Sequence, residues 1–104
     1  MSQNYRVIML PQAFDDIDAI VESIKLDSPQ NAATTIDRLW NAAQSLNEFP
    51  HRYRVHQSSR RPERVVHSMS VTPYIVYYRI IEKPAIVRIL TIRHGARRQP
   101  KRFK

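Results

Sequence analysis

Histidine is the side chain in this sequence best suited to proton transfer, because its imidazole titrates near neutral pH. The candidates for a catalytic acid or base are His67 and His94. Each also has a structural interpretation: His67 alternates with Val65 and Met69 as a packed strand residue would, and His94 would shape a strand end before Gly95. The four histidines match no common zinc-ligand spacing and cysteine is absent, so we expect no metal site.

Arginine and lysine supply a second chemistry, the binding of anions. The formal net charge is +8, but residues 1–50 hold three basic and seven acidic side chains, whereas residues 51–104 hold fourteen basic and two acidic ones. Such a basic half attracts DNA, RNA or an acidic protein, although solvated side chains that only maintain solubility are the alternative. The candidate target-binding residues are Arg79, Arg88, Arg93, Arg97, Arg98, Lys101 and Arg102.

Three tyrosines, Tyr74, Tyr77 and Tyr78, lie in one segment that is dense in aromatic and β-branched residues. Aromatic rings exposed on a sheet can stack on nucleic-acid bases. The structural alternative is a strand that is buried on one face and half-exposed on the other. Trp40 falls on an apolar helix face, so we expect it in the core.

Several classes of protein are excluded by composition. The only glycine, Gly95, cannot form a glycine-rich phosphate loop, which excludes P-loop and Rossmann nucleotide binding, and we expect no cofactor. No apolar run approaches the roughly 20 residues that cross a bilayer. Residues 1–4 lack the pattern of a signal peptide. With 104 residues the chain has room for one domain, which we expect to be cytoplasmic.

A helical hairpin and a group of strands must position these side chains. Residues 5–10 predict a first strand, and Pro11 suits the first turn of a helix. Ser28 can cap a second helix, which ends by residue 50. Residues 51–63 predict a loop, and three further strands follow over residues 64–70, 74–81 and 85–93. The apolar face of the first helix is expected to comprise Phe14, Ile17, Ile20, Val21 and Ile24.

The resulting order, β-α-α-β-β-β, predicts an α+β fold with the helical hairpin packed on one face of a small, mainly antiparallel sheet. The other face stays partly open and would carry alternate side chains of the basic strands. Because a one-residue slip exchanges the two faces, the sequence does not decide whether Arg79 and Arg88 point there. We assign residues 1–96 to the domain and residues 97–104 to a basic tail, for which a solvated, unstructured end is the alternative.

Four short motifs follow one another on these elements. PQAFDD (residues 11–16) opens the first helix, LNEFP (46–50) closes the second, YIVYYRI (74–80) forms a tyrosine-rich strand and ILTIRHGAR (89–97) ends the last strand. In this order they resemble the ParE/RelE superfamily of bacterial toxins from type II toxin–antitoxin systems. The resemblance covers nearly the whole chain.

The resemblance implies one of two activities. RelE-like members are ribosome-dependent nucleases that cut mRNA, whereas ParE-like members are generally linked to poisoning of DNA gyrase. RelE-like members typically carry an arginine where this chain has Tyr74 and a tyrosine where it has Phe103, which has no hydroxyl to transfer a proton. These departures and the HGAR ending favour a ParE-like gyrase inhibitor without hydrolytic chemistry. The alternative is a metal-independent mRNA endonuclease, for which the weak catalytic candidates are His67, His94 and Arg97.

The resemblance also implies a partner. The antitoxins of this superfamily typically have a DNA-binding N-terminal part and a C-terminal segment that is disordered alone and wraps the toxin as helices or as an added strand. An acidic and apolar segment would suit the basic surface, at an exposed edge strand or beside the helical hairpin. We therefore expect a hetero-oligomer with a cognate antitoxin and no membrane partner. A third possibility is a degenerate member that only binds its antitoxin.

Overall fold

The structure of the protein, a computed structural model, describes residues 4–95 and Phe103. The predictions for Arg97, Arg98, Lys101 and Arg102, and for a boundary between residues 96 and 97, lie outside the described residues. The described elements are β1 (Arg6–Met9), α1 (Pro11–Lys25), α2 (Pro29–Gln44), β2 (Val55–Gln57), β3 (Val66–Val71), β4 (Tyr74–Ile81) and β5 (Ile86–His94), with 3₁₀ turns η1 (Ser45–Asn47), η2 (Pro50–Arg52) and η3 (Pro62–Arg64).

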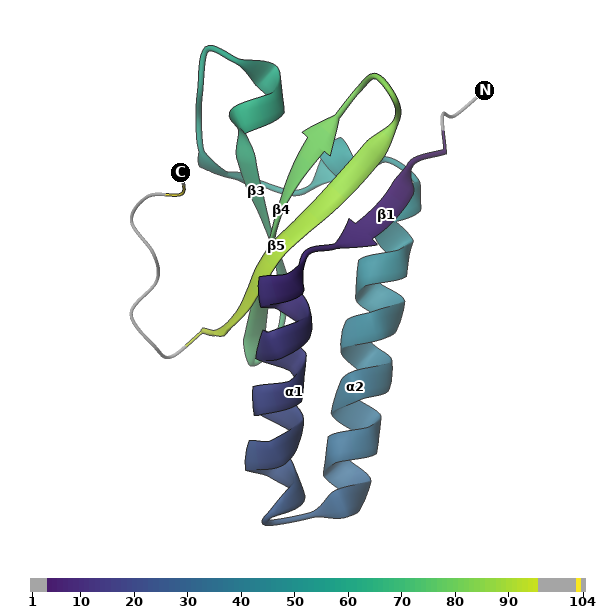
Figure 1. The fold of residues 1–104 in the computed structure, drawn as a ribbon, viewed down its shortest axis with the longest axis vertical. Helices are drawn as coiled ribbons and strands as arrows, with labels where there is room; N and C mark the ends of the chain where they lie inside the picture. The colour runs from purple at the N-terminus through teal and green to yellow at the C-terminus, as the bar shows by residue number, and fades with distance from the viewer. Residues whose placement is uncertain (1–3, 96–102, 104) are drawn as a thin grey trace.

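The strands form one sheet in the order β1-β5-β4-β3-β2. β1 is parallel to β5, and the other neighbours are antiparallel. The two helices run side by side as an antiparallel hairpin (Figure 1), and α1 packs against β5. The predicted α+β fold with a mainly antiparallel sheet is confirmed. The predicted loop over residues 51–63 is partly wrong, because it contains β2 and two short 3₁₀ turns that are too short to show a period.

The helix starts follow the predicted local chemistry. Pro11 occupies the first turn of α1, where its missing N–H costs no hydrogen bond. The Ser28 hydroxyl accepts the backbone N–H of Asn31 at 3.3 Å and caps α2. Ala13 of α1 and Ala43 of α2 are fully buried, so their small side chains allow close packing.

Two predicted core residues lie instead at the surface. Phe14 is 49% exposed and Trp40 is 44% exposed. In each helix the residue just before them, Ala13 or Leu39, is the buried one. Ile17, Ile20 and Ile24 of the predicted face do pack against the core. Successive helical positions differ by about 100°, so the buried stripe is narrower than predicted and leaves Phe14 and Trp40 outside it.

A bulge in the sheet sets which side chains share a face. Tyr77 pairs with Thr91 and Tyr78 pairs with Ile89, which leaves Leu90 as an extra residue of β5. The helix-facing core includes Tyr74, Val76, Tyr78 and Ile80 of β4 and Val87, Ile89 and Ile92 of β5. By this register Arg79, Arg88 and Arg93 alternate with core residues and share the opposite face. Without the bulge, Arg88 and Arg93 would point to opposite faces.

Candidate functional site

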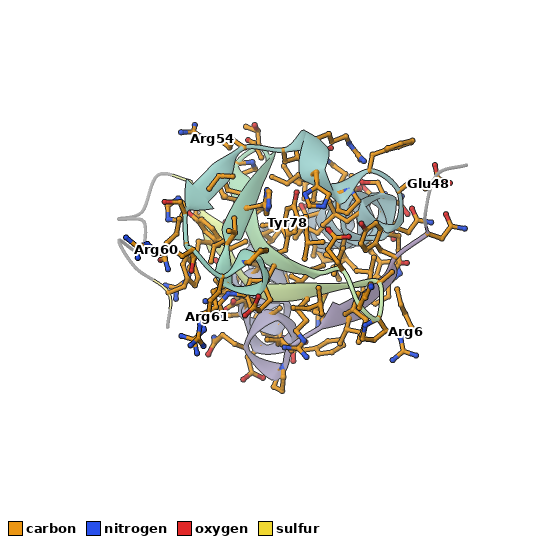
Figure 2. All side chains as sticks on the ribbon, turned by 90° about the horizontal axis from the view of Figure 1, so that it is seen from above. Arg6, Glu48, Arg54, Arg60, Arg61 and Tyr78 are labelled. Atoms are coloured by element: carbon orange, nitrogen blue, oxygen red, sulfur yellow. The ribbon has the colours of Figure 1, made fainter. Side chains whose placement is uncertain are left out.

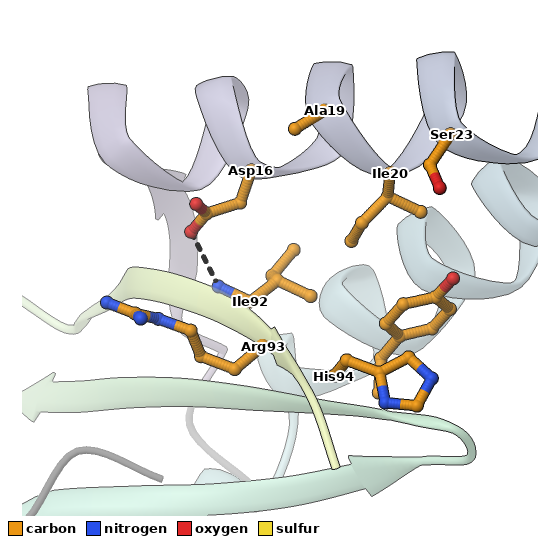
Figure 3. Close-up of a pocket in the computed structure, with 8 residues that line it drawn as sticks. Asp16, Ala19, Ile20, Ser23, Ile92, Arg93 and His94 are labelled. Carbon is orange, nitrogen blue, oxygen red and sulfur yellow. Dashed lines mark hydrogen bonds between the residues drawn. The ribbon is translucent and has the colours of Figure 1, made fainter. Parts of the chain in front are cut away.

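A groove lies between helix α1 and the part of β5 that extends beyond β1. It encloses a cavity of about 450 Å³ (Figure 3). α1 contributes one wall, with two apolar and two polar side chains, and β4 and β5 contribute the facing wall. The lining residues are Asp16, Ala19, Ile20, Ser23, Tyr74, Ile92, Arg93 and His94.

The groove exists because β1 is shorter than its neighbour. β1 ends at Met9, opposite Ile89, and the Leu10 N–H still donates to the Ile89 carbonyl at 3.0 Å. β5 continues to His94, so its last residues have no strand on that side among the described residues. An edge of this kind presents backbone groups that can pair with an added strand.

Asp16 connects α1 to this edge. Its carboxylate accepts the backbone N–H of Ile92 at 2.9 Å (Figure 3). The Thr91 hydroxyl donates to the same oxygen. Asp16 lies beyond the first turn of α1, so an interaction with the positive end of the helix does not account for its position. The contact spans 76 positions, so no local pattern could have revealed it.

One cationic side chain, Arg93, lies at the rim of the groove. Arg93 lies along the edge, where its Nε donates to the Thr91 hydroxyl oxygen at 3.2 Å. The His94 ring meets the Tyr74 ring edge to face, with centroids 5.5 Å apart. An apolar floor beside a free strand edge and a basic rim can bind an extended segment that carries apolar and acidic side chains.

A second surface, which we name the basic face, comprises Arg64, Arg79 and Arg88 on the side of the sheet opposite the helices. Arg79 and Arg88 are direct cross-strand neighbours, and η3 places Arg64 close to β4. Burial, followed by repulsion from Arg64 and Arg88, lowers the pKa of Arg79. Clustered guanidinium groups of this kind favour an anionic partner.

The three tyrosines of β4 offer no open platform for bases. Tyr74 and Tyr78 belong to the core beneath the helices. Tyr77 faces the other way, but it is only 1% exposed, because His56 and Phe103 pack on it. The packing therefore supports a structural role for the tyrosines and not the stacking of nucleic-acid bases.

The structure separates the candidate catalytic residues. His67 is buried, its Nδ1 is 3.1 Å from the Tyr53 carbonyl, and its ring stacks on Tyr78 with centroids 5.3 Å apart. These are the contacts of a packed strand residue. His94 lies at the opposite end of the sheet's core strands, in the groove. Arg97 lies outside the described residues.

One titratable cluster, around Glu82, was not predicted from the sequence. The Glu82 carboxylate accepts the Tyr5 hydroxyl at 2.7 Å and lies 2.6 Å from Nε2 of His51. The hydrogen bond from Tyr5 is the largest cause of a lowered Glu82 pKa, and it raises the pKa of Tyr5. These residues come from three distant segments, and the cluster joins β1, η2 and the β4–β5 turn. The neighbouring Arg52 donates to backbone carbonyls of Ser45, Glu48 and Phe49.

The part of the chain that the structure describes contains no group of three or more His, Cys, Asp or Glu side chains placed to hold a metal ion. Over the same residues, neither helix has the length and apolar character needed to cross a membrane.

The free energy of unfolding is expected to fall as the pH drops from about 7 to 5 because of His67. Burial is the main cause of its lowered pKa, opposed by the hydrogen bond to Tyr53. In the unfolded chain a histidine titrates near its ordinary pKa of about 6.5. Below that pH the unfolded state therefore binds a proton at His67 that the folded state does not bind. The contribution of His67 lowers the free energy of unfolding with a limiting slope of about 1.4 kcal/mol per pH unit.

Urea unfolding between pH 5 and 8 measures this effect. His67→Gln should flatten the pH dependence, whereas the same substitution at the partly exposed His94 should leave most of it. Equal slopes for the wild-type protein and His67→Gln would contradict the assignment.

Comparison with known proteins gives this geometry its context. A family model for the ParE toxin of the type II toxin–antitoxin system parDE matches residues 7–99. The chain is 37% identical over 92 residues to Toxin RelE2 of Caulobacter vibrioides, covering 88% of this chain and 97% of that protein.

Two solved structures share the fold. A chain of the chromosomal ParDE system from P. aeruginosa superposes with a TM-score of 0.69 at 19% identity, covering 89% of this chain and 98% of the other. A chain of the RelBE2 toxin–antitoxin complex from Mycobacterium tuberculosis gives a TM-score of 0.60 at 21% identity, covering 90% and 94%. The family match and the curated relative together show that this chain belongs to the ParE/RelE family of toxins from type II toxin–antitoxin systems.

Proposed function

We propose that this toxin arrests growth by inhibiting DNA gyrase through protein contacts, in the cytoplasm, and that it performs no hydrolytic chemistry. The observation that carries the proposal is Phe103. A side chain without a hydroxyl packs on Tyr77, at a ring-centroid distance of 5.1 Å, where the family resemblance would require a proton donor for RNA cleavage. Burial raises the pKa of Tyr77, so its hydroxyl stays protonated near neutral pH and is not available to accept a proton.

The basic face and Arg93 are the proposed contacts with the target, together with the basic residues of the tail. Figure 2 shows Arg54, Arg60 and Arg61 together at the end of the view opposite to Arg6. This distribution supports an oriented encounter with an acidic protein surface or with gyrase-bound DNA.

We further propose that a cognate antitoxin occupies the groove between α1 and β5. The solved relatives are ParDE and RelBE systems, and the free edge of β5 suits an added strand. The basic rim at Arg93 favours acidic side chains in that segment. The resulting assembly is a hetero-oligomer.

A supercoiling assay with purified gyrase tests the proposal. We expect the toxin to block supercoiling or trap cleaved DNA, and the antitoxin to reverse the effect. The double variant Arg79→Ala/Arg88→Ala should raise the half-inhibitory concentration about tenfold, as expected for loss of interface arginines. Lys25→Ala, in the last turn of α1 on the helix side of the sheet, is the matched control and should leave it unchanged.

Full gyrase activity at excess toxin would overturn the proposal. Ribosome-dependent mRNA cleavage would then be the function to test. The 37% identity to a protein named Toxin RelE2 favours this alternative. Loss of that cleavage in His67→Ala or His94→Ala, with the fold intact, would identify an enzyme. Harmless overexpression would indicate a member that only binds its antitoxin.

A further inference from the structure

Phe103 lies beside Gln57 of β2 and is held there through its main chain. Its N–H donates to Oε1 of Gln57 at 2.5 Å, and Nε2 of Gln57 donates to its carbonyl at 3.0 Å. One side-chain amide thus pairs with both polar groups of a single residue, as a neighbouring strand would. Main-chain recognition of this kind does not depend on the identity of the bound residue.

The ring of Phe103 is recognised separately. Its centroid lies 5.1 Å from that of Tyr77 and 5.8 Å from that of His56, and the His56 and Tyr77 centroids are 4.8 Å apart. These separations are those of favourable aromatic pairs. The site therefore binds both a peptide unit and an aromatic side chain, through Gln57 and through His56 and Tyr77. We name these three residues the aromatic clamp.

The charge of the sequence around Phe103 is poorly matched to the surroundings of the clamp. Residues 97–104 contain five basic side chains and no acidic one. Arg79 lies two residues along β4 from Tyr77 on the same face, with Arg88 beside it. Arg102 and Lys104 flank Phe103 in the sequence, and like charges repel, so binding of Phe103 to the clamp is weakened by its own neighbours.

We propose that the aromatic clamp is a docking site for an acidic, extended segment of a partner protein, whose aromatic side chain replaces Phe103. The clamp supplies the main-chain pairing and the ring contacts, and the basic face supplies charge complementarity. The site lies on the face of the sheet opposite the helices and is separate from the groove between α1 and β5. The proposal does not depend on whether the toxin acts on gyrase.

Synthetic peptides and the full-length protein test the proposal. The probes are the native octapeptide RRQPKRFK, its acidic counterpart EEQPEEFE and the acidic control EEQPEEAE. Phe103→Ala empties the clamp in the protein, and Phe14→Ala removes an exposed phenylalanine elsewhere. NMR chemical shifts of the Gln57 side-chain amide and the His56 ring locate the bound peptide, and calorimetry gives the affinity.

We expect EEQPEEFE to bind Phe103→Ala about tenfold more tightly than either other peptide, which corresponds to about 1.4 kcal/mol. It should bind the wild-type protein and Phe14→Ala more weakly than Phe103→Ala, because Phe103 competes. Gln57→Ala in the Phe103→Ala background should lose about tenfold through the two missing hydrogen bonds, whereas Gln30→Ala on α2 should not. Equal binding of EEQPEEFE and EEQPEEAE, tighter binding of the native peptide, or shifts away from Gln57 and His56 would each overturn the proposal.

Discussion

Replacing Ala19 with tryptophan is expected to weaken antitoxin binding at least about 100-fold, equivalent to about 2.7 kcal/mol. Ala19 lines the groove between α1 and β5 on an exposed part of the helix. An indole there would fill the space beside the free strand edge and block an incoming segment. Because Ala19 is not part of the buried core, the substitution should leave the free energy of unfolding nearly unchanged.

Asp18→Trp is the matched control for this prediction. Asp18 precedes Ala19 and is exposed, but it does not line the groove. Calorimetry with the purified antitoxin should show full affinity for Asp18→Trp. In cells, Ala19→Trp should arrest growth even when the antitoxin is present. Unchanged antitoxin affinity for Ala19→Trp would place the antitoxin on another surface.

The groove illustrates which parts of the site the sequence can predict. The motif that includes Asp16 marks the start of α1, and the last strand is visible as an apolar run up to residue 93. The groove itself depends on how far β1 extends along β5, which is decided by the pairing of Met9 with Ile89. A strand of four residues contains too little pattern to set its own pairing length.

The basic face illustrates a second limit. Period-two alternation predicts the facing of Arg79 and Arg88 relative to their neighbours, but not which face is covered. The extra residue Leu90 then reverses the alternation within β5 and brings Arg93 to the same face. Bulges depend on the partner strand, so the sequence of β5 alone does not reveal one.

The clusters at Glu82 and Gln57 are contacts between residues far apart in the chain. Glu82 joins Tyr5 across 77 positions, and Gln57 joins Phe103 across 46. Only the order of strands in the sheet brings these segments together. The sequence therefore predicted the fold and the toxin family, whereas both clusters had to be observed.

Replacing Tyr78 with alanine is expected to lower the free energy of unfolding by about 4 kcal/mol, as for other buried aromatic side chains. Tyr78 is fully buried, stacks on His67, and donates its hydroxyl to the Pro50 carbonyl at 2.6 Å. Burial raises the pKa of Tyr78, so the hydroxyl keeps its proton and remains a donor. The loss is a large part of the 5–15 kcal/mol that typically stabilises a domain, so partial unfolding at 37 °C is expected.

Tyr78→Phe separates the hydroxyl from the ring. It retains the packing and leaves the Pro50 carbonyl without its donor, which should cost about 1–2 kcal/mol. That carbonyl belongs to η2, directly after Phe49, whose backbone is left-handed at φ 48°. Since a phenylalanine rarely adopts this conformation, the bond from Tyr78 helps to hold the turn that presents His51 to Glu82. Tyr78→Phe should therefore also shift the His51 ring resonances in NMR spectra, whereas Tyr74→Phe, at the other end of β4, should not. Urea unfolding gives the two energies, and a loss below about 2 kcal/mol for Tyr78→Ala would show that the core does not depend on this ring.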